Sequence, residues 1–288
     1  MKITTLFDQG TAKDAEDMFW MRAEGGANKQ RVIAVVADGV SGLYLPEDGP
    51  RLFYGRTGGQ MVCDAIRNAI SSAGTGGSID SLLTMANIRV WESVLHHKLD
   101  MQRSDLLPGA AFAIVRIDEE KIDIVQGADC IVVWQKRNGT VNATKNQVFD
   151  HDSRLQGVVA RLMAEHHGNR QEVWREFTPI LSELRLRNVN RRIQNGYAML
   201  NGQEGVLSCR RRVTLSRRTT RRLIISSDGL VPLSDTQDNK FLARIVMKLF
   251  AKGGLPFILA RTREIEEKEK ETSHIDNAEA TAIAIENL

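Results

Sequence analysis

The chain has 288 residues, 42% of them hydrophobic and 26% charged, and a formal net charge of +3. This composition is typical of a globular protein with length for a buried core. It excludes disorder as the main state, a fibrous repeat and the bulk basicity that favours nucleic acid. Three scattered cysteines are too few for a disulfide framework or a zinc knuckle. The N-terminus lacks the apolar core of a signal peptide, and no apolar run reaches membrane-spanning length, so we expect a cytoplasmic protein.

The first strong strand signal along the chain is the β-branched run Arg31–Ala37, which is typical of a buried strand. We expect this strand to end at Asp38, where an Asp-Gly pair opens a polar loop. Two amphipathic helices are predicted after the loop, one beginning near Gly58 and one covering about residues 78–99.

Three strands in quick succession come next, and their spacing predicts an antiparallel meander. They are Ala110–Ile117, Ile122–Gln126 and Ile131–Gln135. The Asn138-Gly139 pair that follows is a hairpin signal, because both residue types tolerate positive φ at the centre of a tight turn.

The second half of the chain alternates helical and strand patterns. Helices are predicted at 154–165, 171–186, 238–251 and 256–270, and strands at 222–227 and 280–286. Groups of strands separated and followed by helix pairs predict an α+β fold in one domain, residues 1–288. The expected architecture is a four-layer αββα sandwich, in which a central antiparallel β-sandwich is flanked by helix pairs.

The most informative feature for function is a strand–Asp-Gly pattern that occurs twice. A β-branched strand runs directly into Asp-Gly at VIAVVADG and again at RLIISSDG. A strand end holds a carboxylate rigidly at the edge of a sheet, and the adjacent glycine lets a metal or substrate approach closely. Carboxylate oxygens are the ligands that hard divalent cations prefer, so Asp38 and Asp228 are expected to converge on such an ion. Either pair alone is better explained as a simple turn.

Acidic residues near both ends of the chain extend this pattern. Asp14, Glu16 and Asp17 precede an aromatic run, and Asp276-Asn277 precedes the last strand. Each group alone fits a solvated turn or a helix cap. Their order along the chain, interleaved with the two Asp-Gly strands and a further strand–Asp, is much harder to obtain by chance.

This order resembles the metal-dependent serine/threonine phosphatases of the protein phosphatase 2C family, in their bacterial-type form, over nearly the whole chain. The specific blocks are Asp38-Gly39-Val40-Ser41-Gly42 and Ser227-Asp228-Gly229-Leu230. Other matching motifs are Ala15-Glu16-Asp17, Gly109-Ala110-Ala111-Phe112, Ala128-Asp129-Cys130-Ile131, and Asp276-Asn277 ahead of Ala280-Thr281.

The resemblance implies a signalling hydrolase that removes phosphate from phosphoserine or phosphothreonine on protein substrates. Its cofactors would be two divalent cations, manganese or magnesium, which activate a water for in-line attack, so no Cys or Ser nucleophile is needed. Asp38, bridging the ions, and Asp228 are the catalytic residues that it implies. The implied metal ligands are Asp17, Asp38, the Gly39 carbonyl, Asp228 and Asp276, with Glu16 and Asp129 as additional candidates.

Several positions depart from the family pattern. The phosphate-binding Arg of the family corresponds to Ala12, and Lys13 is the candidate replacement, as a point charge in place of a bidentate fork. The carboxylate that helps to hold a third metal corresponds to Pro232. Asp276 precedes Thr281 by five residues, whereas the family spacing is three.

Two segments are candidates for partner choice, because loops on a rigid scaffold usually carry specificity. Residues 151–194 resemble an enlarged, helical flap. Between Arg210 and Arg222, seven of thirteen residues are Arg and none is acidic, which suits a phosphorylated partner or nucleic acid. The stretch lacks aromatic residues for base stacking and is also explained as a solvated hairpin, so a nucleic-acid partner is not expected.

A second class of function stays open. With Ala12 and an irregular last motif, the chain can instead be a catalytically impaired, phosphatase-like module that recognises a phosphorylated partner. We expect a monomer with no membrane partner in either case. Manganese-dependent hydrolysis of p-nitrophenyl phosphate separates the two functions.

Overall fold

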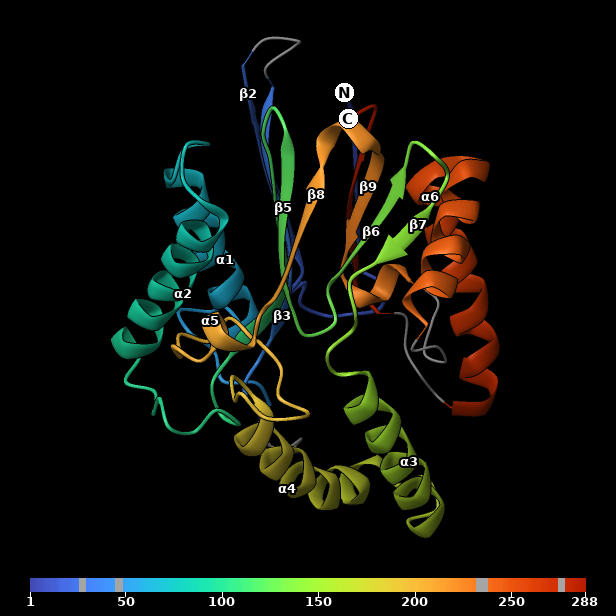
Figure 1. Cartoon of the computed structure of the whole chain (residues 1–288). Helices are drawn as coiled ribbons and strands as arrows, with labels where there is room; N and C mark the ends of the chain where they lie inside the picture. Colours follow the sequence, from blue (N-terminus) through green and yellow to red (C-terminus); the bar gives the residue numbers. More distant parts are fainter. Residues whose placement is uncertain (26–29, 45–48, 232–237, 274–277) are drawn as a thin grey trace.

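Two five-stranded antiparallel sheets lie face to face at the centre of the computed structural model (Figure 1). The structure describes residues 1–25, 30–44, 49–231, 238–273 and 278–288. One sheet has the strand order β1-β10-β9-β6-β7 and the other the order β2-β3-β4-β5-β8. The chain termini lie together, because β1 and β10 are paired.

The strands are β1 (Lys2–Asp8), β2 (Met18–Glu24), β3 (Arg31–Val40), β4 (Gly109–Ile117), β5 (Lys121–Gly127), β6 (Ile131–Lys136), β7 (Val141–Ala143), β8 (Arg211–Ser216), β9 (Thr220–Ser226) and β10 (Ala280–Glu286). The helices are α1 (Gly58–Ser72), α2 (Ile79–His96), α3 (Phe149–Glu165), α4 (Arg170–Asn188), α5 (Val206–Cys209) and α6 (Asn239–Ser273), with short 3₁₀ turns at η1 (Arg217–Thr219) and η2 (Asp228–Leu230).

Three hydrophobic cores hold the layers together, and residues of β3 contribute to two of them. Val32, Ala34 and Val36 pack into the core between the two sheets. Ile33 and Val35 point the other way, into the core beneath α1 and α2. A strand that is covered on both faces needs this continuous apolar run in place of alternation. On the far side of the sandwich, α6 packs on the β6–β9–β10 face through a third core. The predicted four-layer arrangement is therefore confirmed.

Two details of the predicted strands were wrong. β3 does not end at Asp38 but continues through it to Val40, because Asp38 and Gly39 pair with Ala111 and Ala110 of β4. The predicted meander is also split between the sheets: β4 and β5 pair with each other, whereas β6 crosses to the other sheet and pairs with β9. The crossing occurs at the turn after β5, where Ala128 has a left-handed φ of 56°.

The predicted hairpin and the C-terminal helix pair are present, with one correction. β6 and β7 form the hairpin, but only Gly139 (φ 87°) has positive φ; the Asn138 side chain instead accepts a hydrogen bond from the Thr140 N–H at 3.1 Å. α6 contains the two predicted helices, divided by non-helical backbone at Gly253 and Gly254.

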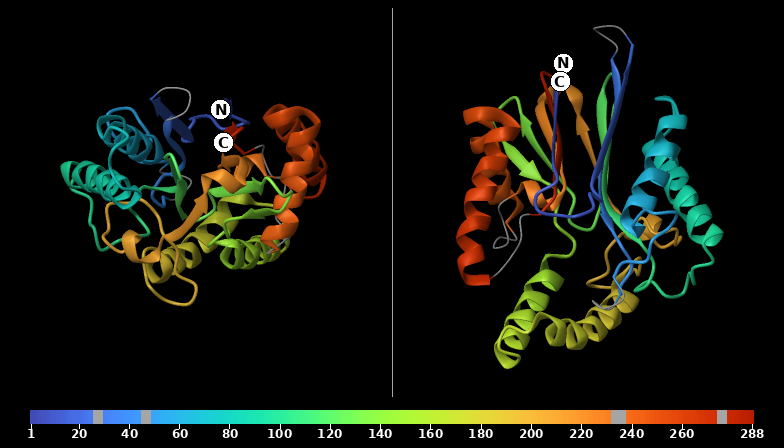
Figure 2. Two further views of the ribbon diagram at one scale, coloured as in Figure 1. Left: turned by 45° about the horizontal axis from the view of Figure 1, so that its top comes forward. Right: turned by 180° about the vertical axis from the view of Figure 1, so that it is seen from behind.

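Helices α3 and α4 lie beyond the ends of the sheets, apart from the layered body (Figures 1 and 2). They contain the two helices predicted at 154–165 and 171–186. Leu162, Val173 and Phe177 form a small core of their own between them. In the described part of the chain, no helix is both long enough and apolar enough to span a bilayer.

Candidate active site

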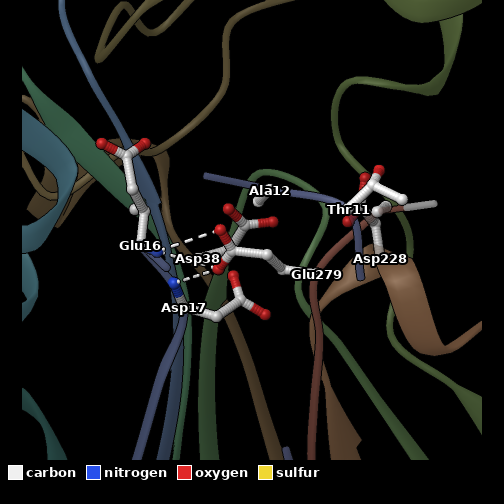
Figure 3. A pocket seen from close by; sticks show the side chains of 9 residues that line it. Thr11, Ala12, Glu16, Asp17, Asp38, Asp228 and Glu279 are labelled. Atoms are coloured by element: carbon white, nitrogen blue, oxygen red, sulfur yellow. Dashed lines mark hydrogen bonds between the residues drawn. The ribbon is translucent and has the colours of Figure 1, made fainter. Parts of the chain in front are cut away.

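A pocket of about 380 Å³ opens where β3, the turn after β9, the start of β10 and the segment before β2 meet (Figure 3). It is lined mostly by carboxylates and small residues. The lining comprises Thr11, Ala12, Glu16, Asp17, Asp38, Gly39, Asp228, Ala278 and Glu279. Segments from both ends of the sequence and from both sheets therefore build one site.

Asp38 and Asp228 form the centre of this site. Asp38 is fixed by its position inside β3, and Asp228 begins the 3₁₀ turn η2, with one residue between it and the end of β9. Burial raises the pKa of the Asp38 carboxyl well above its usual range, and the nearby carboxylates of Asp17 and Asp228 raise it further. Burial also raises the pKa of Asp228, while a hydrogen bond with the Asp38 side chain opposes that rise. Both carboxylates line the pocket.

Asp17 lies beside this pair on the segment that leads into β2. Its Oδ2 accepts a hydrogen bond of 2.7 Å from Ser227 Oγ, which comes from the residue directly before Asp228. Burial raises the pKa of Asp17 to about 7, and the charges of Glu279 and Asp228 add to the rise. A hydroxyl donor of this kind fixes the carboxylate without neutralising it.

Glu279 was missed by the sequence reasoning and has a clear structural task. Its carboxylate accepts hydrogen bonds from the backbone N–H groups of Glu16 (2.8 Å) and Asp17 (2.7 Å), as the dashed lines in Figure 3 show. Glu279 therefore attaches the segment carrying Asp17 to the start of β10. Its position two residues before Thr281, inside the last motif, was the available signal.

The last motif differs from the expected one in the described residues. The position three residues before Thr281, where the family pattern has a carboxylate, is occupied by Ala278, and Ala278 lines the pocket. Asp276, the predicted ligand, lies outside the described residues, as does Pro232.

The carboxylate of Glu16 is directed away from the other acidic side chains (Figure 3). Its Oε1 accepts hydrogen bonds from Ser41 Oγ (2.7 Å) and from Thr57 Oγ1, and Thr57 is the N-cap of α1. A Cβ on Gly59 would lie 2.6 Å from the Glu16 carboxyl carbon, and one on Gly39 would lie 2.6 Å from its carbonyl oxygen. The two glycines therefore allow Glu16 to connect α1 with the site.

Two further acidic residues, Asp129 and Asp152, feel the charge of Asp228 without lining the pocket. Asp129, at the turn between β5 and β6, is half-buried, and its buried Oδ1 has no hydrogen-bond partner among the described residues. Burial raises the pKa of Asp129 well above its usual range, and the charge of Asp228 adds to this. Burial and the charge of Asp228 also raise the pKa of Asp152, on the first turn of α3, to about 7. Sequence reasoning missed Asp152, because nothing local indicates that this turn faces the site.

Neither of the basic features singled out in the sequence contributes to the pocket. Lys13 is exposed and is not among the lining residues, whereas Ala12 is. In the Arg-rich stretch, Arg210 and Arg212 both bind Asp80 at 2.7 Å, so part of its charge ties β8 to α2. Arg217 donates to the backbone carbonyls of Gln30 and Asp118.

The chemistry of the donor set fits divalent cations. Burying several carboxylates together is costly without a counter-charge, and here their pKa values are raised while one buried oxygen has no partner. A hard cation supplies that counter-charge. Within the described ranges, no three acidic, His or Cys side chains already surround one metal-sized point.

Comparisons with known proteins agree with this fold. The family model described as protein phosphatase 2C matches residues 22–255. The fold is similar to that of a bacterial serine phosphatase, with a TM-score of 0.57 and 13% identity over 100% of this chain and 98% of that chain. Stp1 from Staphylococcus aureus has a TM-score of 0.56 and 12% identity, covering 99% of this chain and 94% of its own.

The catalytic domain of the serine/threonine phosphatase PstP, solved with two manganese ions, has a TM-score of 0.52 and 16% identity over 98% of this chain and 96% of that domain. No curated protein matched the sequence. The family match covers most of the chain and includes β3, β9 and the turn that carries Asp228. The chain therefore belongs to the protein phosphatase 2C family, a family of serine/threonine protein phosphatases.

Proposed function

We propose that this protein removes phosphate from phosphoserine or phosphothreonine on protein substrates with the help of two divalent cations, manganese or magnesium. The observation that carries the proposal is a single pocket lined by Asp38 of β3, Asp228 of the turn after β9 and Asp17 of the segment before β2. Solved PstP, which shares the fold, contains two manganese ions.

In this proposal Asp38 and Asp228 hold the cations together, Asp17 and the Gly39 carbonyl contribute further oxygens, and Asp129 extends the donor set. Bound cations supply a water nucleophile at neutral pH and neutralise charge on the phosphoryl group. Asp276 stays a proposed ligand.

The residues around the donor set have positioning tasks in this scheme. Ser227 Oγ orients the Asp17 carboxylate, and Glu279 holds the backbone of the same segment. Both interactions are in place before any ligand arrives, which lowers the cost of organising the site. Ala12 and Ala278 leave the mouth of the pocket without a cationic side chain for the phosphate. We therefore expect a high KM for small substrates.

Metal-dependent turnover of p-nitrophenyl phosphate tests the proposal. The wild-type chain should hydrolyse it with Mn²⁺ and not with EDTA, and Asp38→Asn should reduce the rate to background with a normal circular dichroism spectrum. Glu183→Gln, which removes an exposed carboxylate on α4, is the matched control and should keep the rate. Unchanged turnover in Asp38→Asn would refute the role of this residue.

Ala12 and Ala278 favour one second candidate, a module that binds phosphoproteins without turnover. Its expected result is retained binding of a phosphopeptide together with the absence of hydrolysis at any Mn²⁺ concentration.

A further inference from the structure

A second pocket, of about 700 Å³, lies between α3, α4 and the loop at 191–195. It shares no lining residue with the carboxylate pocket. Its walls come from the segment that the sequence analysis associated with partner choice, and nothing in the proposed chemistry uses it.

The charge of this pocket is opposite to that of the first one. Arg154 from α3, Arg187 from α4 and Arg191 from the loop all line it, and all three are exposed. None of the three guanidinium groups has an ion-pair partner among the residues that the structure describes. Glu183 is the one acidic residue in the lining. Three arginines around one pocket form a natural site for carboxylates or phosphates, which they bind in a bidentate manner.

Apolar side chains in the same pocket indicate the kind of anion. Ile180 and Ile193 line it and are 38% and 49% exposed. Exposed branched side chains next to arginines suit a chain that carries both methylene groups and charges, whereas a small inorganic anion gains nothing from them. The lining therefore favours an acidic peptide over a free ion.

The first turn of α3 connects this pocket to the active site. His151 lines the pocket, is 4% exposed, and donates its Nε2–H to the carbonyl of Asn195 at 2.7 Å, which fixes the loop carrying Arg191. The next residue, Asp152, faces the charge of Asp228. The first turn of α3 thus carries His151, which lines the arginine pocket, and Asp152, whose pKa responds to burial and to the charge of Asp228.

We propose that the arginine pocket, defined by Arg154, Arg187 and Arg191, binds an acidic stretch of the protein substrate next to the phosphorylated residue. The identity of the bound chain as a substrate rests on the proposed function. The binding of an acidic peptide does not.

Fluorescence anisotropy on the full chain with Mn²⁺ tests the binding. Two labelled peptides carry the same phosphonate mimic of phosphoserine, which cannot be hydrolysed, flanked either by Glu and Asp or by Gln and Asn. The wild type should bind the acidic peptide about tenfold more tightly, since three exposed ion pairs contribute a few tenths to 1 kcal/mol each. The triple variant Arg154→Gln/Arg187→Gln/Arg191→Gln should lose this preference.

Matched variants separate charge from folding. Arg192→Gln removes an exposed arginine next in sequence that does not line the pocket, so it should keep the preference. Replacement of the three arginines by lysine should restore part of it. Equal binding of the two peptides by the wild type, or an undiminished preference in the triple variant, would overturn the proposal. So would arginine-dependent binding of an RNA oligonucleotide combined with no binding of the acidic peptide.

Kinetics distinguish this proposal from the proposed function. With hydrolysable peptides, the triple variant should raise KM for the acidic peptide and leave turnover of p-nitrophenyl phosphate unchanged. A wild type that prefers the acidic peptide but hydrolyses nothing contradicts the proposed function alone. A wild type that hydrolyses both peptides with equal KM contradicts the arginine pocket alone.

Discussion

The carboxylate pocket and the arginine pocket are built by opposite means. The first is acidic and is carried by β3 and by short segments that flank β2, β9 and β10, where Ser227 holds the side chain of Asp17 and Glu279 holds its backbone. The second is basic, exposed and carried by two helices that share only a small core with each other. The residues for chemistry, which needs fixed geometry, are held by the sheets. The surface suited to recognition lies on a helical segment whose sequence can vary without disturbing the sheets.

The largest expected effect comes from a change at Asp228, whose carboxylate lines the acidic pocket. Asp228→Asn should abolish Mn²⁺-dependent turnover, since Asp38, Asp129 and Asp152 all lie near its charge. Isothermal titration with Mn²⁺ should show the loss of binding heat, whereas Asp80→Asn, at an ion pair outside the site, should bind normally. Full turnover in Asp228→Asn would place the reaction elsewhere.

Weakening the packing between α3 and α4 tests whether the helices that carry the arginine pocket are independent of the sandwich that carries the carboxylate pocket. Phe177 is 5% exposed in the small core between these helices, and Phe177→Ala should cost about 3–5 kcal/mol locally. Hydrogen exchange should then increase in α3 and α4 and stay unchanged in β3 and β9. Hydrolysis of p-nitrophenyl phosphate should persist while the preference for acidic peptides disappears. Faster exchange in β3 would show that the helices support the sandwich.

The pH dependence of stability sharpens the picture of the acidic region. In the metal-free chain, burial raises the pKa of Asp17 and Asp152 to about 7, from an ordinary value of 3.8. Between these values the folded state holds protons that the unfolded state has released, so the free energy of unfolding falls as pH rises from about 4 to 7 and then levels off. The rise in Tm caused by Mn²⁺ should therefore be larger at pH 8 than at pH 5. Asp152→Asn should flatten the Tm profile measured in EDTA.

The smallest expected effect concerns Asp129. Its buried Oδ1 has no partner in the described structure, so Asp129→Asn should stabilise the metal-free protein at pH 8 by removing an uncompensated charge. We expect a Tm increase of a few degrees, because ~1 kcal/mol shifts the Tm of a chain of this size by about 2–4 °C. Asp118→Asn, at the turn after β4 where Arg116 already pairs with the carboxylate, should not raise it.

The sequence was most informative where a strand and a functional residue coincide. β3, β9 and β10 are covered on both faces, so their apolar runs were visible, and Asp38 and Asp228 lie at or beside the ends of those runs. The exchange of β6 between sheets depends on contacts with β9, which are about 90 residues distant in sequence and follow no local pattern. β1 and β8 escaped prediction because their polar, partly exposed sequences lack such runs.

Within the site, the sequence analysis identified the residues that belong to a motif and missed those that act through the backbone. Glu279 contacts N–H groups of residues 16 and 17, and such contacts leave no periodic signature in a sequence. Asp152 lies on a helix whose placement beneath the sheets is a tertiary property. Glu16 stays a proposed additional ligand; its hydrogen bonds with Ser41 and Thr57 were not visible in the sequence.

The pairing of β1 with β10 has a consequence for synthesis on the ribosome. β1 is made before the other described strands, yet its only strand partner in the described structure, β10, is made after them, with Lys2 opposite Glu286. Until β10 has been made, the edge of β1 stays unpaired, and the segment carrying Asp17 lacks Glu279. Active-site assembly therefore has to wait until β10 has left the ribosome, and a nascent fragment without β10 should show no metal-dependent phosphatase activity.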